Sequence, residues 1–274
     1  MNAARVIVAA FVADARHVQL AALATLVLLS NFWSDFGSGP ASFAAAAAGT
    51  LSAQAVFARL HGQAVEWRSA LITAFSLALL LRAPTPFWHL AAGFAAMSSK
   101  FLIRVNGKHL FNPANLAVVG AILLFDAPWI SPGQWGQVAW VAGLIVVFAA
   151  LVLGRARRLD IALAFLLSYA GLLLARAFYL GDPIEIPLHQ LQSGALLIFT
   201  GFMITDPRST ADHRAGRIGF AIAVAALAVL LSIKFQLVGA PLFALALLSP
   251  ITPLIDRFLP ARRFEWRPKM ESLA

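Results

Sequence analysis

Long uncharged, mostly apolar stretches alternate with short clusters of charged residues along the whole chain. A helix needs about 20 mostly apolar residues to cross a bilayer, with a range of roughly 17–25. Dividing the chain at its charges gives ten candidates, some shorter than this range. They are residues 17–34, 36–58, 69–81, 83–99, 110–125, 135–154, 161–175, 186–205, 218–233 and 235–255. The pattern therefore predicts an all-α membrane protein with about ten transmembrane helices.

The basic residues between these stretches fall unevenly on the two sides of the predicted membrane. With both termini placed in the cytoplasm, 18 Lys and Arg residues lie in inside segments. Only three, Arg82, Arg176 and Lys234, lie in outside segments. Cytoplasmic loops of membrane proteins are enriched in Lys and Arg. The split supports the number of spans and predicts a multi-pass protein of the cell inner membrane with both termini in the cytoplasm.

The composition agrees with a chain that lies mostly in lipid. Charged residues make up 12% of the 274 residues, about half of the roughly 25% typical of soluble domains. We therefore expect a single transmembrane domain over residues 1–274, with an interfacial N-terminal segment at 1–16 and a basic cytoplasmic tail at 257–274. The net charge of +9 is explained by the cytoplasmic loops, so nucleic acid is not expected as a partner.

The chain contains no cysteine, which excludes disulfides and an iron–sulfur cluster ligated by its own thiolates. An organic cofactor is not excluded. No zinc-type spacing or phosphate-binding loop is present either, so we expect no metal site.

Two of the ten stretches are irregular. The fifth opens with Asn112-Pro113-Ala114-Asn115, and the tenth carries Gly239, Pro241, Pro250 and Pro253. Broken helices at matching places in two five-helix halves are typical of inverted repeats. The alternative is that proline is simply tolerated in membrane helices. The short stretch 69–81 is a further candidate for a broken span.

The richest chemistry lies at residues 99–115. Asn112 suits a helix N-cap and Pro113 its first turn, and Asn115 shares a helix face with Asn112. An amide offers donors and acceptors to the edge of a flavin, purine or quinone ring, and Phe111 could stack on that ring. The alternative is a capped helix that follows an ordinary basic loop.

Two more polar groups adjoin the eighth stretch. Thr205 and Asp206 end it on the side predicted for Asn112, where Asp206 either bonds a cofactor or is a loop charge beside the helix-breaking Pro207. The outer end of the stretch carries a second polar cluster, for which we favour hydrogen bonding between helices. This cluster consists of His189, Gln190, Gln192 and Ser193.

At these residues the chain resembles the RnfD/NqrB family, the membrane subunits of the Rnf electron-transport complex and of the sodium-pumping NADH:quinone oxidoreductase. The resemblance rests on Ser99-Lys100, on Lys108 to Asn115, and on Ser193-Gly194-Ala195 with Gly201 to Pro207. It implies two inverted five-helix halves, as in urea transporters, and a non-covalent riboflavin or FMN held by the asparagines. The residues expected to bind the flavin are Lys100, His109, Phe111, Asn112, Asn115, Thr205 and Asp206.

One departure concerns the covalent FMN that family members often attach to a threonine in a Ser-Gly-Ala-Thr type motif. No such motif occurs in this chain. Leu196 follows Ser193-Gly194-Ala195 and has no hydroxyl to esterify. We therefore expect no covalent FMN.

The resemblance implies a membrane subunit that passes electrons through its flavin within a complex of redox proteins, with a quinone among the candidate acceptors. Such a subunit is part of an oxidoreductase rather than a self-sufficient enzyme. Two other functions stay open at this point. One is a channel or transporter for small solutes or ions, and the other is a non-catalytic membrane scaffold for redox partners.

Overall fold

The computed structural model describes residues 14–32, 38–131 and 139–266, most of which lie in helices. The expected interfacial segment 1–16 lies almost wholly outside these residues, as does the end of the basic tail. The first part of the chain forms five helices and three two-residue strands. They are α2 (Ala15–Phe32), α3 (Pro40–Leu60), α4 (Trp67–Leu80), β1 (Leu81–Arg82), α5 (Pro86–Leu102), β2 (Arg104–Val105), β3 (Lys108–His109) and α6 (Pro113–Leu124).

The second part begins with a strand and continues as helices of several kinds. They are β4 (Trp129–Ile130), α7 (Ala139–Ala156), α8 (Leu159–Leu180), α9 (Glu185–Leu191), α10 (Gly194–Ile198), the π-helix η2 (Phe199–Met203), α11 (Arg214–Phe235), α12 (Ala240–Leu248), the 3-10 helix η3 (Ser249–Ile251) and α13 (Thr252–Phe258).

Several helices are long and apolar enough to cross a membrane. Among the described residues, four helical segments meet this criterion, at 40–60, 159–180, 214–235 and 240–258. Shorter apolar helices lie at 67–80, 113–124, 140–156 and 194–203. The chain is thus built as a multi-pass membrane protein. Each of the ten predicted stretches contains helix, and the number of crossings stays a prediction.

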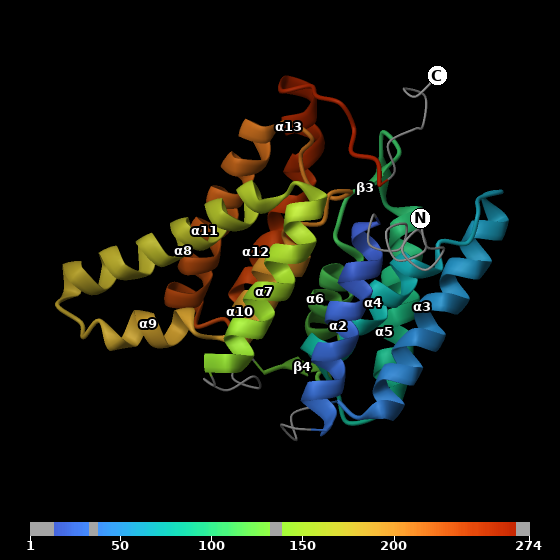
Figure 1. Ribbon diagram of the computed structural model, residues 1–274, viewed down its shortest axis with the longest axis horizontal. Coiled ribbons are helices and arrows are strands. Elements are labelled where there is room, and N and C mark those ends of the chain that lie inside the picture. Colours follow the sequence, from blue (N-terminus) through green and yellow to red (C-terminus); the bar gives the residue numbers. More distant parts are fainter. Residues whose placement is uncertain (1–13, 33–37, 132–138, 267–274) are drawn as a thin grey trace, which may run out of the picture.

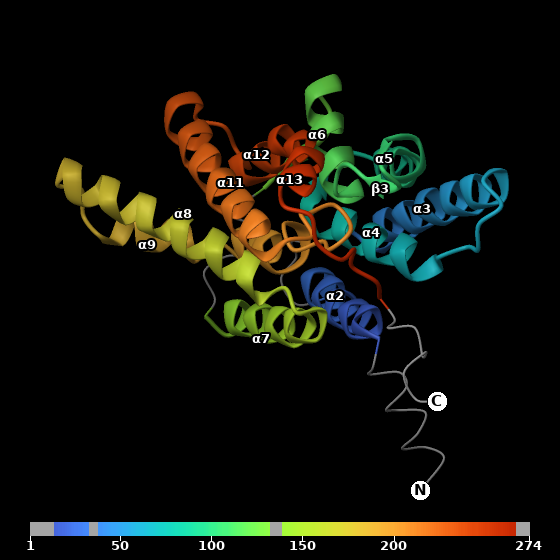
Figure 2. The same ribbon diagram turned by 90° about the horizontal axis from the view of Figure 1, so that it is seen from above.

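Three helix contacts of the first part have counterparts in the second part. In the first part α2 contacts α4, α3 contacts α5, and α5 contacts α6. In the second part α7 contacts α10 and η2, α8 contacts α11, and α11 contacts α12. The parts meet where α2 lies against α7 and α6 against α12, as Figures 1 and 2 show.

Small residues let α3 and α5 approach closely. A Cβ atom on Gly93 would lie only 2.6 Å from the carbonyl oxygen of Ala46, and one on Gly49 would overlap the carbonyl of Leu90. Membrane helices commonly use small residues in this way. The contact fixes α5, which leads into the chemistry-bearing stretch.

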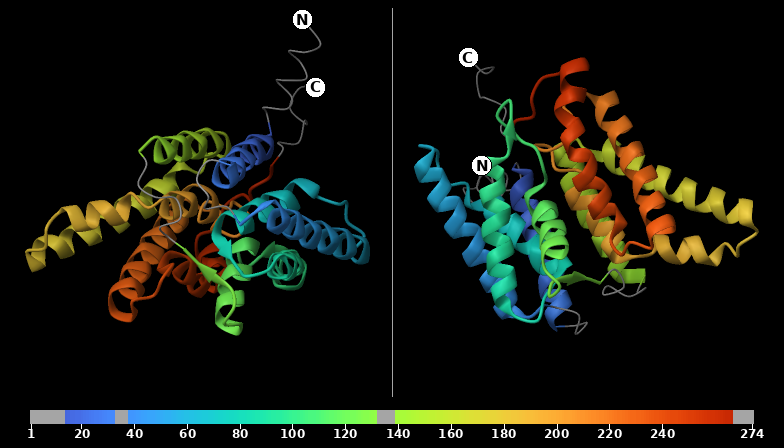
Figure 3. Two further views of the ribbon diagram at one scale, coloured as in Figure 1. Left: turned by 90° about the horizontal axis from the view of Figure 1, so that it is seen from below. Right: turned by 180° about the vertical axis from the view of Figure 1, so that it is seen from behind.

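Loops predicted on the same side of the membrane contact one another. At one end of the molecule, the β2–β3 hairpin, residues 204–213 and the segment 259–266 lie together, and we call this end the basic face. At the opposite face β1 pairs with β4 antiparallel, with Arg82 opposite Trp129. Figure 3 shows the β2–β3 hairpin and β4 at opposite ends of the helices.

Three irregular segments can now be described. The stretch 69–81 is not broken, because α4 runs continuously to Leu80. The eighth stretch was predicted as one span and is wrong in that respect: Ser193 takes an extended conformation (ψ 119°) that ends one helix before α10 and η2 begin. The tenth is interrupted as predicted, by a 3-10 turn at Ser249–Ile251.

Candidate functional site

A tight hairpin begins the site at the basic face. Asn106 and Gly107 both have positive φ, at 51° and 76°, as a type I′ turn requires. The Asn-Gly pair is a strong hairpin signal in a sequence, yet the hairpin was not among the predicted elements. Side chains of neighbouring strand residues point to opposite faces. Lys108 and His109 therefore make contacts with different partners.

The start of α6 follows the sequence-based expectation. Asn112 caps the helix, with its Oδ1 accepting a hydrogen bond from the backbone N–H of Asn115 at 3.0 Å, and Pro113 occupies the first turn. The Asn112 Nδ2 donates to the carbonyl of Met203 at 3.3 Å. This bond joins the two stretches that the sequence singled out, although they are far apart in the chain.

Asn115 has a different environment from Asn112. Its side chain is 1% exposed, and its Nδ2 donates to the carbonyl of Leu242 in α12 at 3.0 Å. Its Oδ1 is buried and has no hydrogen-bond partner among the described residues. Asn115 thus ties α6 to α12.

Asp206 accepts several hydrogen bonds just after the π-helix η2. Its Oδ2 accepts from His109 Nε2 at 3.2 Å and from Ser209 Oγ at 3.0 Å, and its Oδ1 accepts from the backbone N–H of Arg208 at 3.1 Å. Burial alone would raise the pKa of the Asp206 carboxyl. The hydrogen bond from His109 and the charge of its ring instead hold this pKa below its usual value. The hydrogen bonds from Arg208 and Ser209 act in the same direction.

A cavity of about 380 Å³ lies beside these groups, and we call it the central cavity. Of the seven predicted site residues, five line it: Lys100, His109, Asn112, Thr205 and Asp206. Phe111 and Asn115 are not among the lining residues. The walls combine these polar groups with apolar side chains from α4, α7 and η2, which include Ile72, Val152, Leu153 and Phe202.

The charged lining of the central cavity includes residues that the sequence did not indicate. Arg16 forms ion pairs with Asp14 at 2.8 Å and with Glu66 at 2.7 Å. Lys100 Nζ donates to Ser69 Oγ at 2.9 Å, and burial lowers the pKa of Lys100 to about 8. Arg16 and Glu66 are brought together from distant parts of the chain, as are Lys100 and Ser69, so no local spacing could reveal these two contacts.

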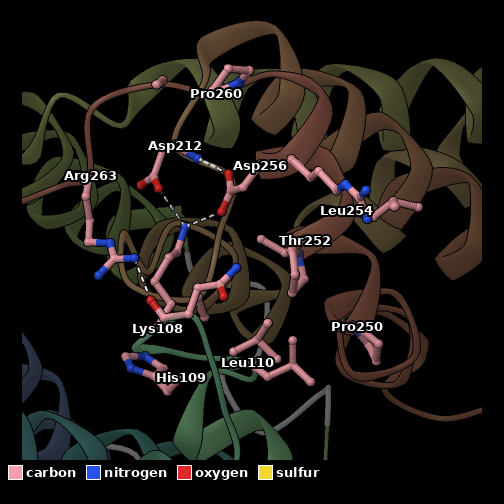
Figure 4. A pocket seen from close by; sticks show the side chains of 16 residues that line it. Lys108, His109, Leu110, Asp212, Pro250, Thr252, Leu254, Asp256, Pro260 and Arg263 are labelled. Carbon is pink, nitrogen blue, oxygen red and sulfur yellow. Dashed lines mark hydrogen bonds and ion pairs between the residues drawn. The ribbon is translucent and has the colours of Figure 1, made fainter.

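A second cavity of about 630 Å³ lies on the other side of the hairpin, and we call it the Lys108 cavity. Figure 4 shows Lys108 reaching between Asp212 and Asp256. Its Nζ lies 2.8 Å from Asp256 Oδ2 and 3.1 Å from Asp212 Oδ2, and donates to the carbonyl of Thr210 at 2.6 Å. His109 lines both cavities, so β3 forms part of the wall between them.

The segment 259–266 crosses the basic face. Arg263 donates to the carbonyl of Asn106 at 2.6 Å. The guanidinium of Arg158 lies 5.1 Å from the ring centre of Phe264, and that of Arg16 lies 5.3 Å from the ring centre of Trp266. This segment thereby contacts both parts of the chain beside the central cavity.

The predicted polar cluster of the eighth stretch lies away from the basic face. Gln190 and Ser193 line a third cavity of about 310 Å³, together with Tyr169 and Phe199. His189, Gln190 and Gln192 are exposed. Within the described residues, no group of three or more His, Cys, Asp or Glu side chains could hold a metal ion.

Comparison with known proteins identifies a family. A family model described as the NQR2, RnfD, RnfE family matches residues 123–265. This match covers about half of the chain and includes η2, Thr205 and Asp206.

Individual relatives extend the similarity beyond that region. The chain is 29% identical to the RnfD subunit of the ion-translocating oxidoreductase complex of Stutzerimonas stutzeri, with 72% of this chain and 75% of the relative covered. The protein of the same name from Alcanivorax borkumensis is 27% identical, with 78% and 81% covered. That from Pseudomonas aeruginosa strain PAO1 is 26% identical, with 73% and 75% covered.

Proposed function

Because the chain belongs to the NQR2, RnfD, RnfE family, we propose that it is the membrane subunit of an electron-transport complex and binds a non-covalent flavin in the central cavity. Its similarity to subunits of ion-translocating oxidoreductase complexes supports a place among redox protein partners. The observation that carries the proposal is the convergence of both polar stretches on one cavity, through Asn112 and Met203 and through His109 and Asp206.

The lining of the central cavity suits an isoalloxazine ring. Such a ring has an apolar dimethylbenzene edge and a pyrimidine edge with hydrogen-bond donors and acceptors. The cavity offers apolar walls and several polar groups, and its volume lies in the range of small-ligand sites, roughly 300–1,000 Å³. The Asn112 amide uses one donor on Met203 and one acceptor position on Asn115, so one of each is left for a ligand.

A bound flavin supplies the electron-transfer chemistry, and the chain supplies binding, orientation and electrostatics. Lys100 and Asn112 would bind the polar edge of the ring. Phe202 and Val152 would cover its apolar part and exclude water. Phe111 does not line the cavity, so we assign it no stacking role.

The ten-crossing topology belongs to the same proposal. We infer one transmembrane domain with two inverted five-helix halves, α2–α6 and α7–α13, in the inner membrane with the basic face in the cytoplasm. The three helix contacts that recur in both halves support this inference, as does the 18-to-3 charge distribution.

The proposal is tested by purifying the full-length chain in mild detergent and recording its absorption spectrum before and after adding riboflavin or FMN. We expect flavin absorption from the native protein and release of the flavin into the supernatant after acid denaturation. Asn112→Leu should weaken flavin binding. A preparation that carries no flavin and rejects both added flavins would refute the proposal.

Transport is the second candidate, and the broken eighth stretch favours it. Phe199 at one end of η2 lines the third cavity, and Phe202 lines the central cavity. Discontinuous helices that line a cavity are also typical of the substrate sites of transporters. Flux of small neutral solutes or cations into liposomes that contain the purified protein would support transport, and flavin binding without flux would exclude it.

A further inference from the structure

Lys100 carries its ammonium group to the central cavity from the last turn of α5. Its Nζ donates to Ser69 Oγ, and an ammonium group has three donors. Among the described residues, no carboxylate oxygen lies within ion-pair distance of this nitrogen. Two donors of a half-buried cation are therefore available to a bound molecule.

The other charges around the central cavity do not neutralise Lys100. The lining contains three cationic side chains, Arg16, Lys100 and Arg208, against two carboxylates, Glu66 and Asp206. Glu66 is paired with Arg16, and Asp206 accepts bonds from His109 and Ser209.

Burial and four charged neighbours change the pKa of Lys100. Burial has the largest effect and lowers its pKa to about 8. Asp206 and Glu66 partly oppose this by raising the pKa, whereas Arg208 and Arg104 lower it further. The ammonium group is thus buried at a cost, and a negative charge from a ligand would offset that cost.

Two anionic groups could come from a flavin. The isoalloxazine ring is neutral when oxidised, and near neutral pH its two-electron reduced form carries a negative charge over N1 and the C2 carbonyl. The phosphate of FMN is anionic in both redox states. Both offer the same chemistry, an anionic hydrogen-bond acceptor, but only the ring charge depends on the redox state.

We propose that Lys100 is the counter-ion of the reduced flavin ring, so that the central cavity binds reduced flavin more tightly than oxidised flavin. This inference rests on the proposed function. In the reduction, a reduced partner protein supplies two electrons and the medium supplies one proton to the ring. The remaining negative charge lies beside Lys100, so Lys100 raises the midpoint potential of the flavin.

The test compares oxidised and dithionite-reduced riboflavin binding to the purified full-length chain, together with the midpoint potential of the bound flavin. Lys100→Met should lower the ratio of reduced to oxidised affinity at least tenfold, which corresponds to about 30 mV for a two-electron couple. Lys100→Arg should preserve most of the ratio. Arg59→Met is the matched control, since Arg59 is exposed and lies outside the cavity.

A measurement on the unaltered protein covers the case in which the variants fold poorly. The ratio of reduced to oxidised riboflavin affinity should fall as the pH rises above about 8, because Lys100 loses its charge there. This fall should exceed the one that the titration of free riboflavin itself causes. Lys100→Arg should abolish this additional fall.

The failures of the two proposals are distinguishable. Absence of flavin binding in the unaltered protein would refute the proposed function. Normal riboflavin binding with the same affinity ratio in Lys100→Met would refute only the counter-ion role. A loss that affects FMN equally in both redox states and leaves riboflavin unchanged would show that Lys100 binds the phosphate, which also contradicts the inference.

Discussion

Lys100 and Lys108 lie close together in the chain at the basic face, and their ammonium groups have opposite surroundings. Lys108 is enclosed by Asp212, Asp256 and a backbone carbonyl. Lys100 has one hydroxyl partner and faces the central cavity. The same side chain thus completes an internal ion cluster in one place and offers unsatisfied donors in the other.

The difference separates a charge with internal partners from a charge whose donors remain open to a ligand. A buried cation with two carboxylates holds three segments of chain together. A half-buried cation without a carboxylate, as at Lys100, also costs stability, and this is expected where the charge serves a ligand. Number and type of charges alone do not distinguish the two cases, whereas their partners do.

The largest effect is expected from Lys108→Met. This substitution leaves Asp212 and Asp256 facing each other without a cation, and breaking a buried ion pair on one side costs about 3–5 kcal/mol. Thermal unfolding in detergent should show a large loss of stability. Lys108→Arg keeps the charge and should lose less. If both variants unfold like the unaltered protein, the Lys108 cluster does not stabilise the fold.

Substitutions of the two asparagines should both lower stability, but only one of them should weaken flavin binding. Asn112→Leu removes a helix cap, at a cost of about 1 kcal/mol, and should also weaken flavin binding. Asn115→Leu loses the bond to Leu242, again about 1 kcal/mol, but should leave flavin affinity unchanged. Equilibrium binding of riboflavin and thermal unfolding measure both quantities. Equal losses of affinity would contradict the separate roles.

An effect of opposite sign is expected for the stability of Lys100→Met. The folded-state pKa of Lys100, about 8, lies below its unfolded value of about 10.4, so protonation disfavours folding. The unaltered protein bears this cost fully below pH 8 and loses it as the pH rises toward the unfolded pKa. Without flavin, Lys100→Met should therefore melt higher at pH 7, and the difference should shrink above pH 8 and vanish above about pH 10.4. A lower melting temperature at pH 7 would contradict this.

The smallest effect is expected from Arg263→Ala. Its bond to Asn106 is exposed, and surface substitutions usually change stability by less than about 0.5 kcal/mol. The melting temperature should stay nearly constant, in contrast to Lys108→Met on the same cavity. A loss comparable to that of Lys108→Met would show that the hairpin depends on the segment 259–266.

Much of the local structure could be predicted from the sequence. The cap at Asn112, the turn at Pro113 and the interruption near Pro250 follow from backbone chemistry within a few residues. The shared location of Asn112 and Asp206 followed from counting spans. Local rules also failed at Ser193, where a helix ends without a proline to mark the position.

The contacts that define the cavities could not be predicted in this way. Arg16 meets Glu66, and Lys108 meets Asp256, across long stretches of chain. Asn112 and Asn115 share a helix face, as expected, yet only Asn112 lines the cavity because α12 covers Asn115. Such distinctions depend on how helices distant in sequence pack.

The two halves of the molecule are joined at both faces. The segment 259–266 contacts Arg158 and Arg16 at the basic face, and β1 pairs with β4 at the other. Ties at both ends oppose the rocking of one half against the other. In the electron carrier proposed above, such contacts would limit relaxation when charge arrives, which would keep the reorganisation energy low and the tunnelling distance constant.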